Sequence, residues 1–541
     1  MASDRAIESR GRRDELVGVG ILTRFLLRVD RTKGPGWVAG IGAMALYVSV
    51  AVPVAYRDDL EGAVQVFSGP VGRLLTGPGH GLDEPTLERL VAGGYGLYFM
   101  LLSALMSILL VVRHTRAEEQ SGRAELVRAS VVGREAGLVA ALVVALLTNL
   151  AAGAAVFVVL VAVGGFAVAG SALLGCSVAA VGLAFGAVAA VTAQLSRYAR
   201  VASGLAGGVL AAAFVLRGGG DLAREGGSVL SWLSPLGWAQ QAGPYVLDRW
   251  WPLLLLLGFA AVTTAVAFAL ADRRDLGASF LADRPGPARA HPSLGSVWGL
   301  AWRLQRPSIV GWTASLAVAG FVFGLFAEAL GEAAEDLPEV MAELFGTEDL
   351  VAGYLAVMAF LLAVMVAVQG VLAVQALLAE ETSGRGATLL AAPVRRAALL
   401  LAATVTAGAG MVLASLAAGA ASGLDAAVVT GDAHHVGDLV LAQLNLLPSA
   451  LVALGVATVL YGAWPRALGA AWVVVGWGFV VGTFGELLDL PGWARALDPF
   501  HHPAPMPLEP FAAAPVVVLS AVAVVAVGLG AAGLTRREYE V

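Results

Sequence analysis

Runs of about twenty consecutive apolar residues constrain this chain more than any other feature. Apolar residue types make up 58% of its 541 residues, and they gather in long runs instead of alternating with polar residues. A helix of about 20 residues is about 30 Å long, which matches the hydrocarbon core of a bilayer. In lipid, only helices and closed barrels satisfy their own backbone hydrogen bonds, and the lack of alternation favours helices. The sequence therefore predicts an all-α polytopic membrane protein.

The apolar runs predict about twelve transmembrane helices, although the run at 201–216 is short. Their approximate ranges are 37–56, 92–112, 137–164, 168–193, 201–216, 252–271, 309–330, 350–379, 398–421, 436–460, 466–488 and 511–534.

The basic residues predict the orientation of these helices. If the N-terminus is cytoplasmic, most of the 34 lysine and arginine residues fall in cytoplasmic segments, as the positive-inside rule requires. Those on the other side are Arg57, Arg73, Arg89, Arg217, Arg224, Arg249 and Arg495. Removing one helix would invert every later loop and destroy this bias. We therefore expect a multi-pass protein of the cell membrane with both termini in the cytoplasm.

Several classes of function are disfavoured by what the sequence lacks. Cys176 is the only cysteine, so neither a disulfide within the chain nor a cysteine-rich metal site can form. Lys33 is the only lysine and does not lie in a phosphate-binding GxxxxGK[ST] loop. The histidine pairs at 434–435 and 501–502 lack the spacing of metal ligands. We expect no catalytic residues, no metal, no cofactor and no nucleic-acid partner in this chain.

The chain is an internal duplication. Residues 118–123, EEQSGR, recur as residues 380–385, EETSGR, and each copy follows an apolar run and precedes another. Pro235 similarly matches Pro499, and the DRRD that closes the sixth predicted helix matches TRRE after the twelfth. Because each repeat holds six helices, both enter the membrane from the same side, as two parallel six-helix repeats. A pathway between the halves suits a transporter.

The repeats divide the chain into four predicted segments. Residues 1–36 form a cytoplasmic leader with an interfacial, amphipathic elbow helix, and residues 37–272 form the first six-helix half. Residues 273–308 form a cytoplasmic, proline-containing linker with a second elbow helix, and residues 309–541 form the second half.

The repeated loop has the composition of a docking surface. Gly122 and Gly384 permit a sharp turn, and short helices are expected at about 124–130 and 386–391, with Thr115 as a possible cap. Acidic side chains beside an exposed apolar one suit a soluble partner with a basic cleft. The alternative is an ordinary charged cytoplasmic loop. The rules of membrane insertion explain its arginines, but they do not explain why the EExSGR motif occurs twice. The predicted docking residues are Glu118, Glu119, Ser121, Gly122, Arg123 and Leu126, and Glu380, Glu381, Ser383, Gly384, Arg385 and Leu389.

The chain resembles permeases of the ATP-binding-cassette exporter superfamily, of the type-2 class. More narrowly, it is similar to the fused, double-length actinobacterial permeases described as exporters of polyketide antibiotics, including tetronasin-like ionophores. The similarity covers nearly the whole chain, and its most specific segments are 113–129, 232–241, 249–257 and 273–278.

This resemblance implies elbow helices at 15–33 and 297–308 and coupling helices at 116–130 and 380–392. It also implies two copies of a separate ATPase subunit, which hold ATP and Mg²⁺ and dock on the two loops. Closure of the ATPases on ATP would rock the halves and export a hydrophobic or amphipathic compound, antibiotic or drug-like.

In such permeases the second and fifth helices of each half line the pathway. The corresponding candidates here are Phe99, Met106, Met365, Gln369 and Trp477, for each of which ordinary helix packing is the competing interpretation. Asn149 and Asn445 can likewise bond neighbouring helices or contact a substrate.

Two other classes of protein compete with this interpretation. An ion-coupled secondary multidrug transporter also often has twelve helices in two parallel halves, but it needs ionisable residues near the middle of the membrane. A membrane enzyme needs a cluster of carboxylates, histidines or metal ligands at one membrane face. The predicted helices are almost free of ionisable residues away from their ends, and the acidic outer segment at 328–349 lacks catalytic spacing.

Overall fold

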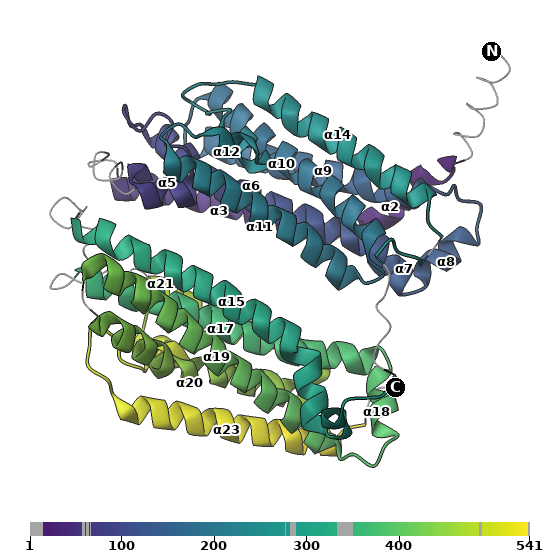
Figure 1. Cartoon of the computed structure of the whole chain (residues 1–541), viewed down its shortest axis with the longest axis vertical. Coiled ribbons are helices and arrows are strands. Elements are labelled where there is room, and N and C mark those ends of the chain that lie inside the picture. Colours follow the sequence, from purple (N-terminus) through teal and green to yellow (C-terminus); the bar gives the residue numbers. More distant parts are fainter. Residues whose placement is uncertain are drawn as a thin grey trace. The chain divides into compact units, whose positions relative to one another are not determined.

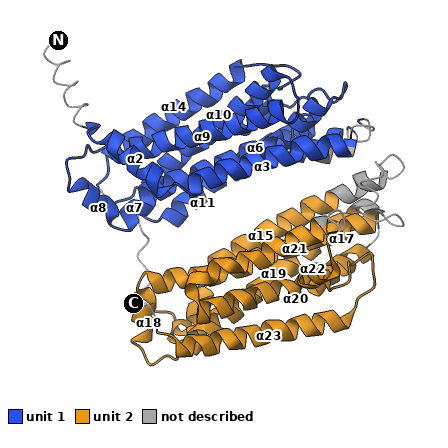
Figure 2. Ribbon diagram, turned by 180° about the vertical axis from the view of Figure 1, so that it is seen from behind, with its two compact units in different colours: residues 1–285 blue, residues 286–541 orange. Residues whose placement is uncertain are grey.

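The computed structural model describes residues 15–56, 60, 64, 67–275, 277–281, 288–332, 350–431, 433–485 and 490–538. Within these residues every regular element is a helix (Figure 1). The chain divides into two compact units, unit 1 at residues 1–285 and unit 2 at residues 286–541 (Figure 2).

Twelve of the helices are long and apolar enough to cross a membrane, six in each unit. This confirms the predicted all-α polytopic membrane fold. The helices of unit 1 are α3 (Lys33–Tyr56), α6 (Leu87–Val112), α9 (Ala136–Ala162), α10 (Val168–Leu195), α11 (Ala199–Ala223) and α14 (Trp251–Asp272). Those of unit 2 are α15 (Val297–Glu332), α17 (Leu350–Thr382), α19 (Arg396–Thr430), α20 (His434–Ala463), α21 (Ala471–Phe484) and α23 (Ala513–Arg536).

The helix α11 is longer than its apolar run predicts. It continues for two turns past residue 216 to Ala223 and includes Arg217, which the sequence assigned to an outer loop. Arg217 is fully buried and donates to Asp221 Oδ2 at 3.3 Å and to Leu74 O at 2.7 Å. The helix can continue because this pair neutralises the charges that end the apolar run.

One helix forms the centre of each unit, α10 in unit 1 and α20 in unit 2. Small residues allow close packing there: a Cβ added to Gly153 would lie 2.4 Å from Gly175 O, between α9 and α10. A Cβ added to Gly462 would lie 2.0 Å from Gly530 O, between α20 and α23. These are the close backbone approaches that small residues permit between membrane helices.

Short helices lie between the long ones, at 217–251 and 489–510 as expected and also at 70–76, where none was predicted. They include α5 (Pro70–Thr76), α12 (Val229–Trp232) and α13 (Pro235–Gln240) in unit 1, and α22 (Gly492–Ala496) and η4 (Pro499–His501) in unit 2. The matched prolines begin α13 and η4, each after a side chain that caps the new helix. In unit 1, α5 and α12 lie at the end opposite α8 (Arg123–Arg128) (Figure 1).

The two predicted elbow helices differ. The first is a separate helix, α2 (Val19–Val29), as expected. The second, predicted at 297–308, is instead the beginning of α15, which continues through Pro307 to Glu332. Of the acidic segment at 328–349, residues 333–349 lie outside the described residues.

Candidate functional site

The two repeats of the EExSGR motif form the same backbone turn. In unit 1 the chain passes from α6 through a π-helix, η1 (Arg113–Ala117), and α7 (Glu118–Gln120) to Gly122 and α8. In unit 2 it passes from α17 through Gly384 to α18 (Arg385–Leu390). Both glycines have a φ of 76°, a region that glycine adopts without strain. The turns and both short helices are therefore confirmed.

The expected cap at Thr115 is wrong. Its Oγ1 donates to Val111 O at 2.7 Å, one turn back along the same helix, and not to a new helix start. The helical backbone therefore continues from α6 into η1, whose π geometry is often found at functional sites.

The first acidic residue of each motif faces outward. Both oxygens of Glu118 accept from Arg123, each at 2.8 Å, and both oxygens of Glu380 accept from Arg385 at 2.6 and 2.8 Å. These hydrogen bonds raise the pKa of both arginines. Ser121 and Ser383 close the turns by donating to the backbone carbonyls of the same two glutamates.

The second acidic residue of each motif faces inward. Glu119 accepts from Arg274, at the end of α14, at 2.6 and 2.9 Å, and Glu381 accepts from Arg537, after α23, at 2.6 and 2.7 Å. The glutamate side chains are only 12% and 1% exposed. The expectation that all four carboxylates present themselves to a partner is therefore corrected: two of them hold the loop to its own unit. The sequence carried a signal for these two contacts, because Arg274 and Arg537 occupy matching positions after the sixth and twelfth long helices.

The apolar residues of the two short helices are unequal. Leu126 on α8 is 75% exposed, whereas Leu389 on α18 is 37% exposed. Glu125 and Arg128 on α8 correspond to Ala387 and Leu390 on α18. The two predicted docking surfaces therefore share the Glu–Arg pair and differ around it.

In unit 1 the loop is also bound to α2, which the sequence did not predict. His114 Nε2 lies 2.5 Å from Asp30 Oδ2 at the end of α2, and Arg113 donates to the same oxygen. At the other end of α2, Gly133 N donates to Val17 O at 2.9 Å. The helix is thus held to the loop at both of its ends.

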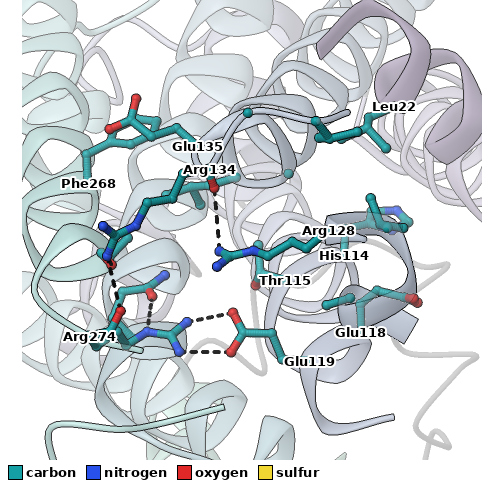
Figure 3. A pocket seen from close by; sticks show the side chains of 18 of the residues that line it. Leu22, His114, Thr115, Glu118, Glu119, Arg128, Arg134, Glu135, Phe268 and Arg274 are labelled. Carbon is teal, nitrogen blue, oxygen red and sulfur yellow. Dashed lines mark hydrogen bonds and ion pairs between the residues drawn. The ribbon is translucent and has the colours of Figure 1, made fainter. Parts of the chain in front are cut away.

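A cavity of about 130 Å³ lies between α2, the loop, α9 and the end of α14 (Figure 3). Its wall is mainly apolar, with Leu22 and Phe268 on opposite elements, and it also includes the Glu119–Arg274 pair. Arg128 extends across it and donates to Arg134 O at 3.5 Å (Figure 3). Among the described residues, this cavity included, no group of three or more His, Cys, Asp or Glu residues is placed to bind a metal.

The predicted pathway residues differ in burial within their own units. Phe99 and Met106 of α6 are fully buried inside unit 1. On α17, Met365 is exposed, while Gln369 is buried and its Oε1 has no hydrogen-bond partner. Trp477 of α21 is half-buried and donates to Ala494 O at 3.1 Å.

Comparison with known proteins finds sequence similarity over nearly the full chain. A family model described as "Multidrug efflux system permease Rv1217c, C-terminal domain" matches residues 294–535. The chain is also 37% identical over 525 residues to the "Multidrug efflux system permease protein Rv1217c" of Mycobacterium tuberculosis (strain ATCC 25618 / H37Rv), covering 96% of this chain and 94% of the relative. The chain therefore belongs to the family of multidrug efflux system permeases.

Proposed function

We propose that this protein is the membrane-spanning permease subunit of an ATP-driven exporter. It would move a hydrophobic or amphipathic compound, antibiotic or drug-like, out of the cell. The observation that supports this most directly is the loop built twice, once after the second long helix of each unit, with the same exposed Glu–Arg pair and glycine turn. The relative's name, a multidrug efflux permease, points to the same activity.

The energy would come from separate ATPase subunits, in two copies, one on each loop. The assignment to the type-2 ATP-binding-cassette class belongs to this proposal and rests on the sequence resemblance. ATP and Mg²⁺ would be bound by that partner, because this chain has no GxxxxGK[ST] loop. The outward Glu118–Arg123 and Glu380–Arg385 pairs, with Leu126 and Leu389, would form the contact surfaces.

Export also requires an orientation, which the arginine distribution supports. We place both termini and both loops in the cytoplasm. ATPase closure would then push each loop toward its unit, and the pathway would open toward the outside. Along that pathway, Met365 and Gln369 of α17 are the stronger candidates, because one is exposed and the other has an unsatisfied amide oxygen. Trp477 remains a candidate, whereas burial of Phe99 and Met106 favours helix packing.

The competing function, ion-coupled secondary transport, needs an ionisable group deep in the membrane. The buried Arg217–Asp221 pair lies in the last two turns of α11, and Asp425 lies near the end of α19. Both positions are near helix ends, which favours a structural role over ion coupling.

Co-purification with the ATPase encoded beside this chain tests the proposal. We expect a stable complex whose ATP hydrolysis is inhibited by vanadate and stimulated by lipophilic compounds. If no ATPase binds, and dye efflux instead stops when the proton gradient is dissipated, the protein is a secondary transporter.

A further inference from the structure

We propose that the Glu119–Arg274 and Glu381–Arg537 pairs are mechanical links that carry movement of each docking loop to the last long helix of its unit, α14 or α23. This inference rests on the proposed function of the loops. The four side chains act as positioning residues, and none of them needs to touch the partner or the transported compound.

The geometry of each pair is that of a strong, directional contact. Both hydrogen bonds of each pair are between 2.6 and 2.9 Å, and the carboxylates are almost fully buried. Parallel, charge-assisted bonds between a guanidinium and a carboxylate fix both distance and orientation. The partners are 155 and 156 residues apart in the chain, so only the folded structure joins them.

The pair recurs although its surroundings differ. In unit 1, Arg116 also donates to Glu119 at 2.7 Å, whereas Leu378 stands at the corresponding position of unit 2. In unit 2 the guanidinium of Arg537 instead lies 5.2 Å from the centre of the Tyr461 ring. Packing alone would not produce the same pair in two different environments, so the contact itself is the shared feature.

A second contact strengthens the link from the far end of each loop. Arg134 donates to Asp272 O at 2.7 Å, and Arg396 donates to Arg537 O at 3.0 Å. Each arginine thus binds a carbonyl at the carboxyl end of the last long helix of its own unit, α14 or α23. A cation is favourable at that end of a helix. Each loop therefore holds that end from both sides.

The arrangement places the outward and inward contacts on adjacent residues. Glu118 and Glu380 face solvent, and the next residue in each case reaches the last helix. The helices α14 and α23 lie at the periphery of their units, because only 17% and 22% of the residues in their most apolar stretches are buried, against 83% for α10 and 72% for α20. A displacement of the loop would therefore move the last helix before it moves the centre of the unit.

The test uses unit 2, where the glutamate of the pair is the more deeply buried: the Glu381 side chain is 1% exposed, against 12% for Glu119. Glu381→Leu combined with Arg537→Met removes both charges, which avoids leaving one of them buried alone. Arg536→Gln is the matched control, because it removes the adjacent, exposed arginine. Each variant is reconstituted in proteoliposomes with the ATPase, and ATPase content, ATP hydrolysis and export of a lipophilic fluorescent dye are measured.

We expect the double variant to keep its ATPase content and hydrolysis while exporting about tenfold less dye per ATP, within the usual range of coupling between sites. Arg536→Gln should export normally, and the charge exchange Glu381→Arg with Arg537→Glu should export more than either single change.

Wild-type export by the double variant would overturn the link. Loss of ATPase from the double variant alone would also overturn it, because Glu381 would then belong to the docking surface. A wild-type permease that binds no ATPase would overturn the proposed function itself.

Discussion

Asn149, a polar residue in the middle of α9, shows how single residues hold the apolar helices of unit 1 together. Its Oδ1 accepts from Ser103 at 2.8 Å, and its Nδ2 donates to Ser107 Oγ at 2.7 Å. Both serines lie on α6, so the amide joins two helices and is satisfied without a substrate. Asn445 of α20 donates to Ala504 O at 2.9 Å, while its own Oδ1 is buried without a hydrogen-bond partner.

Gly182 on α10 faces this amide and should not tolerate a side chain. A Cβ there would lie 1.8 Å from Asn149 Oδ1 and 2.3 Å from Ser103 Oγ. We expect Gly182→Ala to destabilise the protein by about 1–3 kcal/mol through overpacking, measured by thermal unfolding in detergent. Gly186→Ala, one turn along, is the control, because its nearest contact would be 3.5 Å away. Equal stability of the two variants would contradict this account.

The buried carboxyl of Asp498 should make the stability of the folded protein depend on pH. Its carboxyl is fully buried, Oδ1 accepts from Phe500 N at 2.9 Å, and Oδ2 has no hydrogen-bond partner. Burial raises its pKa from 3.8 to about 6. Because the folded state binds the proton more tightly than the unfolded state, stability falls as pH rises between these two values, and the loss is complete above the higher one.

Asp498→Asn should remove this loss while an amide oxygen still accepts from Phe500 N. We expect the variant to be more stable than wild type at neutral pH by up to about 3 kcal/mol, and the difference to shrink as pH falls toward the unfolded pKa. Thermal unfolding of both proteins across this pH range measures the effect. A difference that does not change with pH would show that the carboxyl remains in one protonation state.

The short loop helices α8 and α18 differ between the two repeats in their exposed side chains and in their surroundings. They share a glycine turn and an outward ion pair, but α8 carries the more exposed leucine, and the loop before it is held to α2 by the contact between His114 and Asp30. In unit 2 the corresponding elbow residues continue directly into α15. An ATPase subunit would therefore meet two related but unequal surfaces.

This inequality predicts that Leu126→Asp weakens ATPase binding more than Leu389→Asp. Truncation or reversal of a central apolar contact commonly costs about 2 kcal/mol or more, which corresponds to ~30-fold in affinity. Titration of the purified ATPase against permease in nanodiscs measures this. Val131→Asp is the control, because Val131 is exposed but lies beyond α8. Equal effects of the Leu126 and Val131 changes would contradict docking on α8.

For the whole molecule, the proposal depends on which ends of the helices face the cytoplasm. Within unit 1, the loop with α7 and α8 lies at the end opposite α5 and α12 (Figure 1). Helices of 22 to 34 residues separate these two ends by more than a bilayer core. The two ends must therefore face opposite sides of the membrane.

Because Cys176 is the only cysteine, this orientation can be tested in a Cys176→Ser background. Ser130→Cys lies in the loop after α8, and Glu225→Cys lies after α11 at the other end of unit 1. With a membrane-impermeant maleimide on intact cells, we expect labelling at position 225 and, only after permeabilisation, at position 130. The reverse pattern would place the loops outside and would exclude ATPase docking on them.

The sequence alone determined the features that depend on local composition. Apolar runs long enough to span a bilayer set the number of membrane helices, and a glycine in a polar segment permits a turn, so the twelve helices, the duplication and both short loop helices were predictable. Twelve helices and two EExSGR motifs follow without knowledge of any contact between distant residues.

Only the tertiary structure decided which way the side chains of those motifs face. Glu118 and Glu119 are adjacent and chemically identical, yet one faces solvent and the other binds an arginine 155 residues away. Arg217 likewise lies inside a helix because Leu74 O, 143 residues away in the chain, accepts a hydrogen bond from it, in addition to the ion pair with Asp221 one turn along. A buried charge is stable only where a partner is within hydrogen-bonding distance, and the fold, not the local sequence, brings that partner there.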